Sequence, residues 1–278
     1  MDREATCAAL VDICTPGLGA GLAERFVALG MPGHDLTRAA PGEETGRCRF
    51  GGHPLLTPGT PWPDVDGHPL TFLAVLDTDA LPWLDGVIPP GTGLLNFFYL
   101  DGDSEACHPA AHALGLTYMP DDPKAGAVIR APSADPVETV APERASVFRP
   151  VPWKAVPGIG FPDDWDPAWD LLDLRDHPDD DVRSLPSVYL LDAVNGWNAR
   201  PGALDSDDIA FGRPTFPTGS SFHIPGKADP NAYTHLLQLS TQDDWWIGGD
   251  GGTMHWSIPT EALKAGDFTK AVPTPDIY

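Results

Sequence analysis

The sequence predicts an α+β protein with a mostly antiparallel sheet built from two related halves and with N-terminal helices packed against it. Three observations support this fold class: helical periodicity before residue 30, short apolar segments separated by turns after residue 33, and an order of turns and strands that occurs twice. The 278 residues include 29 glycines and 32 prolines, a share well above average. Because they are interleaved with aromatic and aliphatic residues, they favour many turns between short strands.

Two helices are expected at the N-terminus. The first covers residues 4–14, and Pro16 with Gly17 is expected to interrupt it. The second covers residues 18–29, where apolar side chains recur at helical spacing. Gly30 is well placed to end this second helix, and Pro32 prevents it from resuming.

Short strands separated by glycine and proline turns follow. The segment from Thr253 to Ile258 alternates apolar and polar residues, as a half-buried antiparallel strand does. Residues 132–162 are expected to be mostly extended, with helices expected at 163–174, 187–197 and 259–265. The predicted strands are Leu70–Asp77, Leu94–Leu100, Ala127–Ala131, Tyr233–Ser240 and Thr253–Ile258.

The two halves of the chain resemble each other in the order of their motifs. Each half has a Phe-Gly turn ending in proline, then a buried strand, an acidic turn and an aromatic strand; the two turns begin at Phe50 and Phe211. Such half-sheets can cover each other's apolar sides. The prediction is therefore a single domain over residues 1–278, with an internal pseudo-repeat at 47–131 and 207–272. Residues 132–206 form a connection rich in proline and aspartate, with short helices.

The charge limits the classes of partner. The chain has 17 Lys and Arg against 40 Asp and Glu, a formal net charge of −23. Such an acidic protein repels phosphate backbones and anionic lipid headgroups, which argues against nucleic-acid and membrane-surface roles. No export signal or apolar run long enough to span a membrane is recognisable, and four cysteines are too few for a disulfide scaffold. We therefore expect a cytoplasmic protein with reduced thiols.

The ordered motifs resemble the bacterial YwqG-like family. They comprise Phe50-Gly51-Gly52-His53-Pro54, Trp62-Pro63, Gly67–Leu73, Gly93–Tyr99, Leu236–Leu239, Gly249–Gly252, Ile258 and Asp267-Phe268. The family carries a domain of unknown function, so the resemblance implies a mixed α+β fold with a largely antiparallel sheet and implies no reaction. Relatives usually place a glutamine shortly after the second Gly-x-Pro turn. Here that turn is followed by Thr215-Phe216-Pro217-Thr218, so no role of that glutamine carries over.

Motifs for the common chemistries are missing. The sequence contains no Gly-x-Ser-x-Gly elbow, phosphate-binding loop or His-Glu-x-x-His pair, which leaves catalytic residues unassigned and predicts no cofactor. The segment from Cys107 to His112 has metal-like spacing but lacks a second ligand pair and is expected to form a turn, so no metal is predicted. The acidic run Asp205–Asp208 could bind calcium, although solvated loops are the commoner role of such runs.

The candidate ligand site is aromatic and glycine-rich. Trp246 precedes a glycine loop that carries one carboxylate, Asp250, and Trp62 in the first-half loop could face them. Aromatic walls with a few polar groups are typical of ligand pockets, although the tryptophans could simply fill the core and the glycines form tight turns. The candidate ligand-binding residues are Trp62, Trp246, Asp250, Gly51, Gly52 and His53.

Two functional hypotheses follow. The leading one is a binding or interaction module without enzymatic activity, of accessory or immunity type, whose acidic surface meets a basic protein partner. The alternative is an uncharacterised hydrolase or carbohydrate-active enzyme acting on a small-molecule ligand in a cleft between the two halves, near Trp62 and Asp250. A calcium-stabilised structural protein is a third option.

Overall fold

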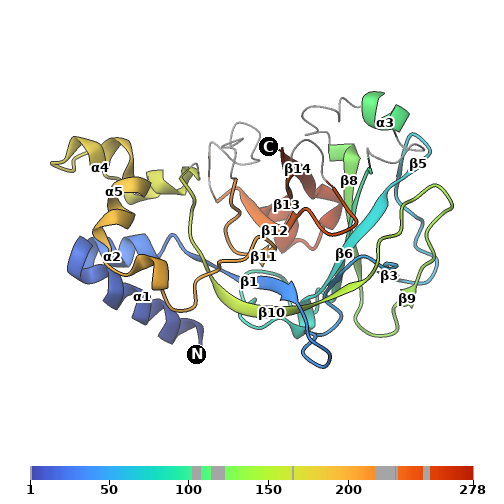
Figure 1. The fold of residues 1–278 in the computed structure, drawn as a ribbon, viewed down its shortest axis with the longest axis horizontal. Coiled ribbons are helices and arrows are strands. Elements are labelled where there is room, and N and C mark those ends of the chain that lie inside the picture. Colours follow the sequence, from blue (N-terminus) through green and yellow to red (C-terminus); the bar gives the residue numbers. More distant parts are fainter. Residues whose placement is uncertain are drawn as a thin grey trace.

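The computed structural model describes residues 2–101, 108–113, 123–164, 166–216, 229, 231–246 and 251–277. These residues form a strongly curled antiparallel sheet and a lobe of short helices beside it (Figure 1). Among the described residues, no helix is long and apolar enough to cross a membrane.

The main sheet has ten strands among the described residues, and all of its neighbouring strands run antiparallel. Their order across the sheet is β14-β13-β12-β11-β1-β10-β2-β6-β7-β8. Two small ribbons, β3–β9 and β4–β5, flank the sheet. The strands are β1 (Met31–Arg38), β2 (Arg49–Phe50), β3 (Leu55–Leu56), β4 (Asp64–Val65), β5 (His68–Pro69), β6 (Thr71–Asp77), β7 (Leu94–Tyr99), β8 (Gly126–Ala131), β9 (Val137–Glu138), β10 (Val151–Gly160), β11 (Ile209–Phe211), β12 (Tyr233–Ser240), β13 (Gly252–Pro259) and β14 (Val272–Ile277).

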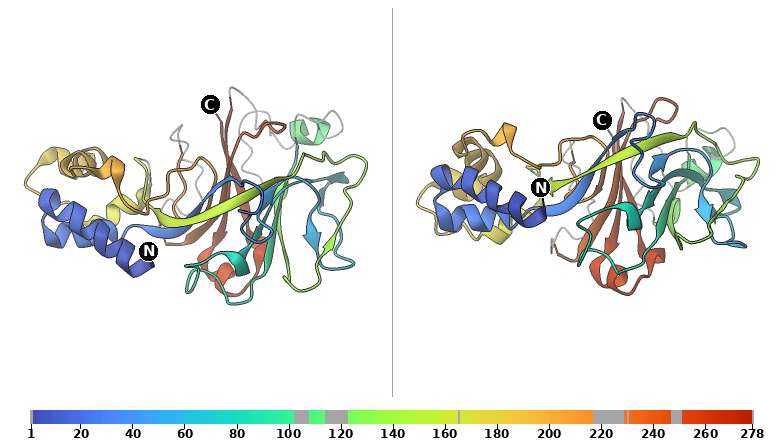
Figure 2. Two further views of the ribbon diagram at one scale, coloured as in Figure 1. Left: turned by 60° about the horizontal axis from the view of Figure 1, so that its bottom comes forward. Right: turned by 90° about the horizontal axis from the view of Figure 1, so that it is seen from below.

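The sheet curls until its two edge strands approach each other, which gives a nearly closed barrel (Figure 2). At the seam, a Cβ added to Gly126 of β8 would lie 2.9 Å from the ring of Pro273 in β14. The interior holds the largest apolar cluster, in which Phe97 and Trp256 meet edge to face with ring centroids 5.4 Å apart. All five strand segments predicted from the sequence are present in this sheet, with bounds shifted by a residue or two.

The central pair, β1 and β10, is the part of the sheet that the sequence pattern indicated least. Residues 132–162 were expected to be extended, and β10 lies there, but no strand was predicted over residues 31–38. In β1 the run Pro32-Gly33-His34 interrupts the apolar alternation. Gly33 is required by close packing, because a Cβ there would lie 2.7 Å from the backbone nitrogen of Gly212.

The helices form a lobe of their own. They share an apolar cluster in which Phe26 stacks on Phe161 and Trp169 and meets Trp197 at a tilt, and the cluster reaches the sheet at Ile159 of β10. The expectation that the N-terminal helices pack against the sheet is therefore wrong, because their apolar stripe faces the helices of residues 167–199. The lobe comprises α1 (Arg3–Leu18), α2 (Ala20–Val27), η3 (Pro167–Leu172), α4 (Asp180–Ser184), α5 (Pro186–Ala193) and η4 (Trp197–Ala199).

Several helix boundaries differ from the prediction. α1 continues through Pro16 and ends at Gly19, whose positive φ of 75° suits glycine. The helix expected at 163–174 is a 3-10 helix, η3, and the one expected at 187–197 ends at Ala193. The prediction of a helix at 259–265 is confirmed by α6. The other short helices of the described residues are η1 (Thr78–Ala80), α3 (His108–Ala113), η2 (Pro123–Ala125), α6 (Thr260–Lys264) and η6 (Phe268–Lys270).

The metal-like segment is also helical. α3 includes His108 and His112, so the expected turn at Pro109 is wrong. Proline is tolerated at the second position of a helix, because the backbone N–H that it lacks would have no acceptor within the helix there. Cys107 lies outside the described residues. Among the residues that are described, no group of three His, Cys, Asp or Glu side chains is arranged to hold a metal ion.

Candidate functional site

The glycine turn of the first half is a structural bend. Gly51 and Gly52 both have positive φ, 65° and 79°, and a Cβ on Gly51 would lie 2.5 Å from the carbonyl oxygen of Arg149. The next residue, His53, accepts a hydrogen bond from the Arg49 guanidinium at its carbonyl oxygen. The two glycines therefore let the chain turn beneath residues 148–150.

Trp62 lies on the outer side of the first-half strands. Its ring meets that of Phe98 edge to face at 5.4 Å, and its Nε1 donates to the carbonyl oxygen of Leu70 at 2.8 Å. It also lines an open cavity of about 390 Å³ together with Pro69, Glu143 and other residues of that surface. Trp62 is thus half-buried and belongs to the packing of this face.

Trp246 lies at one end of the barrel, in a different cavity. Its side chain is 49% exposed and lines a depression of about 510 Å³ together with Arg38, Trp153 and Asp208. The structure therefore does not bring Trp62 and Trp246 into a common cavity, as the predicted cleft between the halves requires. Asp250 lies outside the described residues.

Charged side chains connect this end of the barrel. Asp243 pairs with Arg38 at 2.6 Å and with Arg149 at 3.1 Å, and the Arg38 guanidinium lowers the pKa of the Asp243 carboxyl. Asp208 accepts hydrogen bonds from the backbone and hydroxyl of Ser240, and burial raises the pKa of Asp208. The carboxylate of Asp208 is therefore engaged in holding β12, which argues against the run at 205–208 being a calcium loop.

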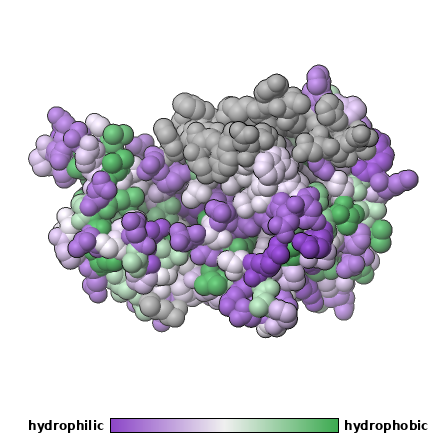
Figure 3. Space-filling view, in the orientation of Figure 1, coloured by the Kyte–Doolittle hydropathy of each residue, from purple (hydrophilic) through white to green (hydrophobic). Residues whose placement is uncertain are grey.

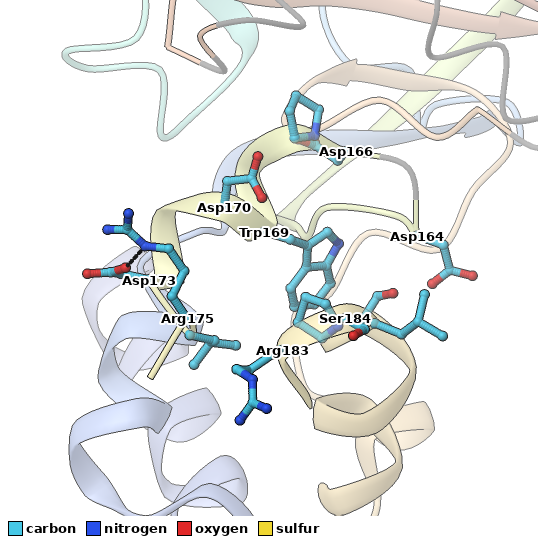
Figure 4. Close-up of a pocket in the computed structure, with 13 residues that line it drawn as sticks. Asp164, Asp166, Trp169, Asp170, Asp173, Arg175, Arg183 and Ser184 are labelled. Atoms are coloured by element: carbon cyan, nitrogen blue, oxygen red, sulfur yellow. Dashed lines mark hydrogen bonds and ion pairs between the residues drawn. The ribbon is translucent and has the colours of Figure 1, made fainter. Parts of the chain in front are cut away.

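A cavity lined wholly by described residues lies in the helical lobe (Figure 4). It has a volume of about 700 Å³ and lies between η3 on one side and α4 with α5 on the other. Trp169 projects into the space between these elements in Figure 4, and its Nε1 donates to the carbonyl oxygen of Asp163 at 2.6 Å. Asp166 begins η3 by accepting the Ala168 N–H at 2.8 Å.

The cavity and its surroundings are strongly acidic. Residues 163–192 carry ten aspartates against two arginines. Arg175 pairs with Asp173 at 2.8 Å and lowers the pKa of that carboxyl, and Arg183 pairs with Asp180. The carboxylate of Asp181 raises the pKa of the Tyr189 phenol, as expected in a negative local field.

Exposed apolar side chains gather on the same lobe. Figure 3 shows hydrophobic residues interspersed with hydrophilic ones over this part of the surface, on the left of the view. Four of the large hydrophobic residues that are exposed come from η3 and from the α4–α5 region, and two of them, Leu185 and Val188, are 55% and 44% exposed. The four are Leu171, Leu185, Val188 and Tyr189.

Arg213 joins the lobe to the sheet. It is 7% exposed, its Nε donates to the carbonyl oxygen of Leu29 at 2.7 Å, and its Nη1 lies 3.4 Å from the carboxylate of Asp166. A second link is the Phe216 N–H, which donates to Asp163 at 2.6 Å. These bonds fix the wall of the lobe cavity relative to β11 and the segment that follows it.

The lobe was not among the predicted site residues, because acidic runs are usually solvated loops. The available signal was the alternation of aspartates with leucine, valine and tyrosine over residues 170–192. Such a mixture offers both charge and apolar area to a partner.

The fold and these surfaces define a mixed helix-and-sheet protein built on a nearly closed antiparallel barrel with an acidic helical lobe. The family model described as "Domain of unknown function (DUF1963)" matches residues 48–276. The chain therefore belongs to this family, whose name records no activity. The matched region includes the helical residues 167–199 and most of the barrel, but begins after α1, α2 and β1. No curated protein matches the chain.

Proposed function

We propose that this protein is a binding module that captures a basic protein partner on its helical lobe. The observation that carries the proposal is the coincidence of ten aspartates, four exposed apolar side chains and a cavity of about 700 Å³ in residues 163–192. Carboxylates steer a cationic partner and speed its association, whereas apolar side chains supply the area that retains it. An accessory or immunity-type role in the cytoplasm fits such a module.

The experiment compares two charge variants of the full chain. The lobe variant carries Asp170→Asn, Asp173→Asn and Asp181→Asn, and the control variant removes equal charge from the barrel with Asp64→Asn, Asp66→Asn and Asp85→Asn. All six side chains are exposed or lie at the surface, so both variants should fold. Each is used to retrieve partners from native lysate at low and at high salt.

The proposal predicts that the wild type and the control variant retain the same basic protein at low salt and release it at high salt, because screening weakens such contacts. The lobe variant should retain markedly less of it. Equal retention by both variants would show that overall charge, rather than the lobe, binds the partner. Retention unaffected by salt would refute the electrostatic part of the proposal.

We also propose that the barrel arose from two related halves, residues 47–131 and 207–272, within a single domain, and that the narrower YwqG-like assignment applies. The strand order reads identically from both ends if β1, β2, β6, β7 and β8 are matched with β10, β11, β12, β13 and β14. Each half also has an irregularity in the same strand pair, at Leu73 between β6 and β7 and at Leu236 between β12 and β13.

Details of the two turns support the same match. After β2, Gly51 and Gly52 have positive φ, and at the end of β11 so do Phe211 and Gly212. Aligning these positive-φ residues matches Phe50 with Ala210 rather than with Phe211, one residue away from the match suggested by the sequence. Side-chain amides then hold the following backbone in both halves: the Leu55 N–H donates to Asn96, and the Thr215 N–H donates to Gln238, each at 2.8 Å. An experimental structure in which 47–131 and 207–272 do not superimpose in this strand order would refute the duplication.

A further inference from the structure

The outward face of β12–β14 is polar, and its side chains are buried. In this part of the sheet, Leu237, Met254 and Trp256 point into the barrel core. The residues that alternate with them lie on the opposite face, where His235 is opposite Ser257, His255 is opposite both Gln238 and Thr274, and Thr253 is opposite Asp276. Each of these side chains is at most 7% exposed: His235, Gln238, Thr253, His255, Ser257, Thr274 and Asp276.

The corresponding face of β6–β8 is apolar. It belongs to a separate hydrophobic cluster that includes Leu56 and the half-buried Trp62. Asn96 is the polar exception, and its amide both donates to and accepts from the backbone of Leu55. The seven positions that match the polar set are Phe72, Val75, Leu94, Asn96, Phe98, Ile129 and Ala131. Apolar side chains therefore suffice to cover this sheet, and stability alone does not require the polar set.

Among the residues that the structure describes, three polar atoms of the polar face have no hydrogen-bond partner: Nε2 of His235, Nδ1 of His255 and Oγ1 of Thr274. Nδ1 of His235 lies 3.1 Å from the carbonyl oxygen of Phe211. Because a carbonyl accepts, this nitrogen carries the proton, and Nε2 therefore presents a lone pair. The two imidazole rings are 5.9 Å apart. Burying such groups without partners is costly.

The chemistry of the face limits what it can bind. Burial lowers the pKa of His235 to about 4 and that of His255 well below its usual value, so both rings are neutral at neutral pH. None of the seven residues is a lysine or arginine, so with both rings neutral these side chains offer no positive charge to an anion. An apolar molecule would leave the three atoms unpaired. A hydroxyl group both donates and accepts, and so it can serve all three.

We propose that the outward face of β12–β14 binds a small uncharged polyol or sugar. One hydroxyl of the ligand donates to Nε2 of His235, and others bond to Nδ1 of His255 and to Oγ1 of Thr274. The Phe216 ring, stacked on His255 at 4.3 Å, closes one side of the site. This site is separate from the helical lobe and does not depend on partner capture.

The test uses the full chain with labelled histidine side chains. Nitrogen NMR spectra of the imidazoles are recorded while glycerol, myo-inositol, glucose and ribose are added separately, with zinc and inorganic phosphate as further probes. A polyol or sugar that occupies the site should shift the His235 and His255 resonances and leave that of His34, a buried histidine on the other side of the sheet, in place.

Two matched substitutions then locate the site. Thr274→Val removes the unpartnered hydroxyl with little change of shape and should weaken binding about tenfold, the equivalent of one hydrogen bond. Thr241→Val removes another unpartnered hydroxyl, beside Trp246, and should leave the affinity unchanged. Shifts caused by zinc or phosphate alone, no shift with any of the four hydroxyl compounds, or equal affinity of the Thr274→Val protein would each overturn the proposal.

Discussion

Acid should destabilise this protein through histidines that are buried in their neutral form. Burial lowers the pKa of His34 and of His235 from 6.5 to about 4. As the pH falls below 6.5, the unfolded chain binds protons at these residues, whereas the folded chain binds them near pH 4. Their contribution to stability is therefore complete above pH 6.5 and is lost progressively as the pH falls towards 4.

The size of the effect follows from the same values. A pH of 5 lies about 1.5 units below the pKa of 6.5 that these histidines have in the unfolded chain. Protonation at pH 5 therefore lowers the free energy of the unfolded state by about 2 kcal/mol per histidine, or about 4 kcal/mol for the two. His255 acts in the same direction. Asp35 and Asp208 oppose it, because burial raises the pKa of both carboxyls and their folded forms take up protons more readily. A loss of about 4 kcal/mol is a large part of the total stability of a typical domain.

The assay is urea denaturation followed by tryptophan fluorescence at pH 7 and at pH 5. The wild type should lose about 4 kcal/mol of unfolding free energy between the two. A variant with His34→Leu and His235→Leu should lose much less over this range, even if it is less stable at pH 7. A wild-type unfolding free energy that is equal at the two pH values would refute the assignment of neutral buried histidines.

Three further predictions concern packing and can be checked by thermal unfolding. Gly33→Ala should destabilise the protein strongly, because the new Cβ would lie 2.7 Å from the Gly212 nitrogen. Gly21→Ala in α2, where a Cβ meets open space, should instead stabilise it by about 0.5–1 kcal/mol. Similar effects of the two substitutions would contradict the close approach of β1 and β11. Arg213→Met should cost about 3–5 kcal/mol, because it leaves the Asp166 carboxylate buried without its partner; a neutral result would mean that this pair does not hold the lobe. Trp256→Ala should cost about 3–5 kcal/mol at the centre of the barrel, and a loss below about 1 kcal/mol would contradict its full burial.

Local patterns in the sequence predicted most of the outer strands. The alternation over Thr253–Ile258 and the apolar run of Leu70–Asp77 both reflect burial that neighbouring residues share. β1 has no such pattern, because its residues pack between β10 and β11, which are distant in sequence. Its glycine is explained by that close packing and not by a turn. Tertiary contacts of this kind do not appear in a local window.

The candidate site was predicted less well, for two physical reasons. The sequence placed Trp62 and Trp246 in corresponding loops of the two halves, but in the structure they line separate cavities. The alternation predicted over Thr253–Ile258 puts His255 on the polar face of its strand, which the structure confirms. The burial of that face depends on contacts with residues distant in sequence. Without that information, a polar alternation indicates solvent and not an enclosed site.

Capture of a basic partner by the helical lobe is the central claim, and hydrogen exchange tests it most directly. The amide exchange of the protein is measured alone and with the basic protein that it retains at low salt. The account predicts slower exchange in α4, α5 and η3 when the partner is present, and unchanged exchange in β6–β8. Protection confined to the barrel, with the lobe unaffected, would contradict it.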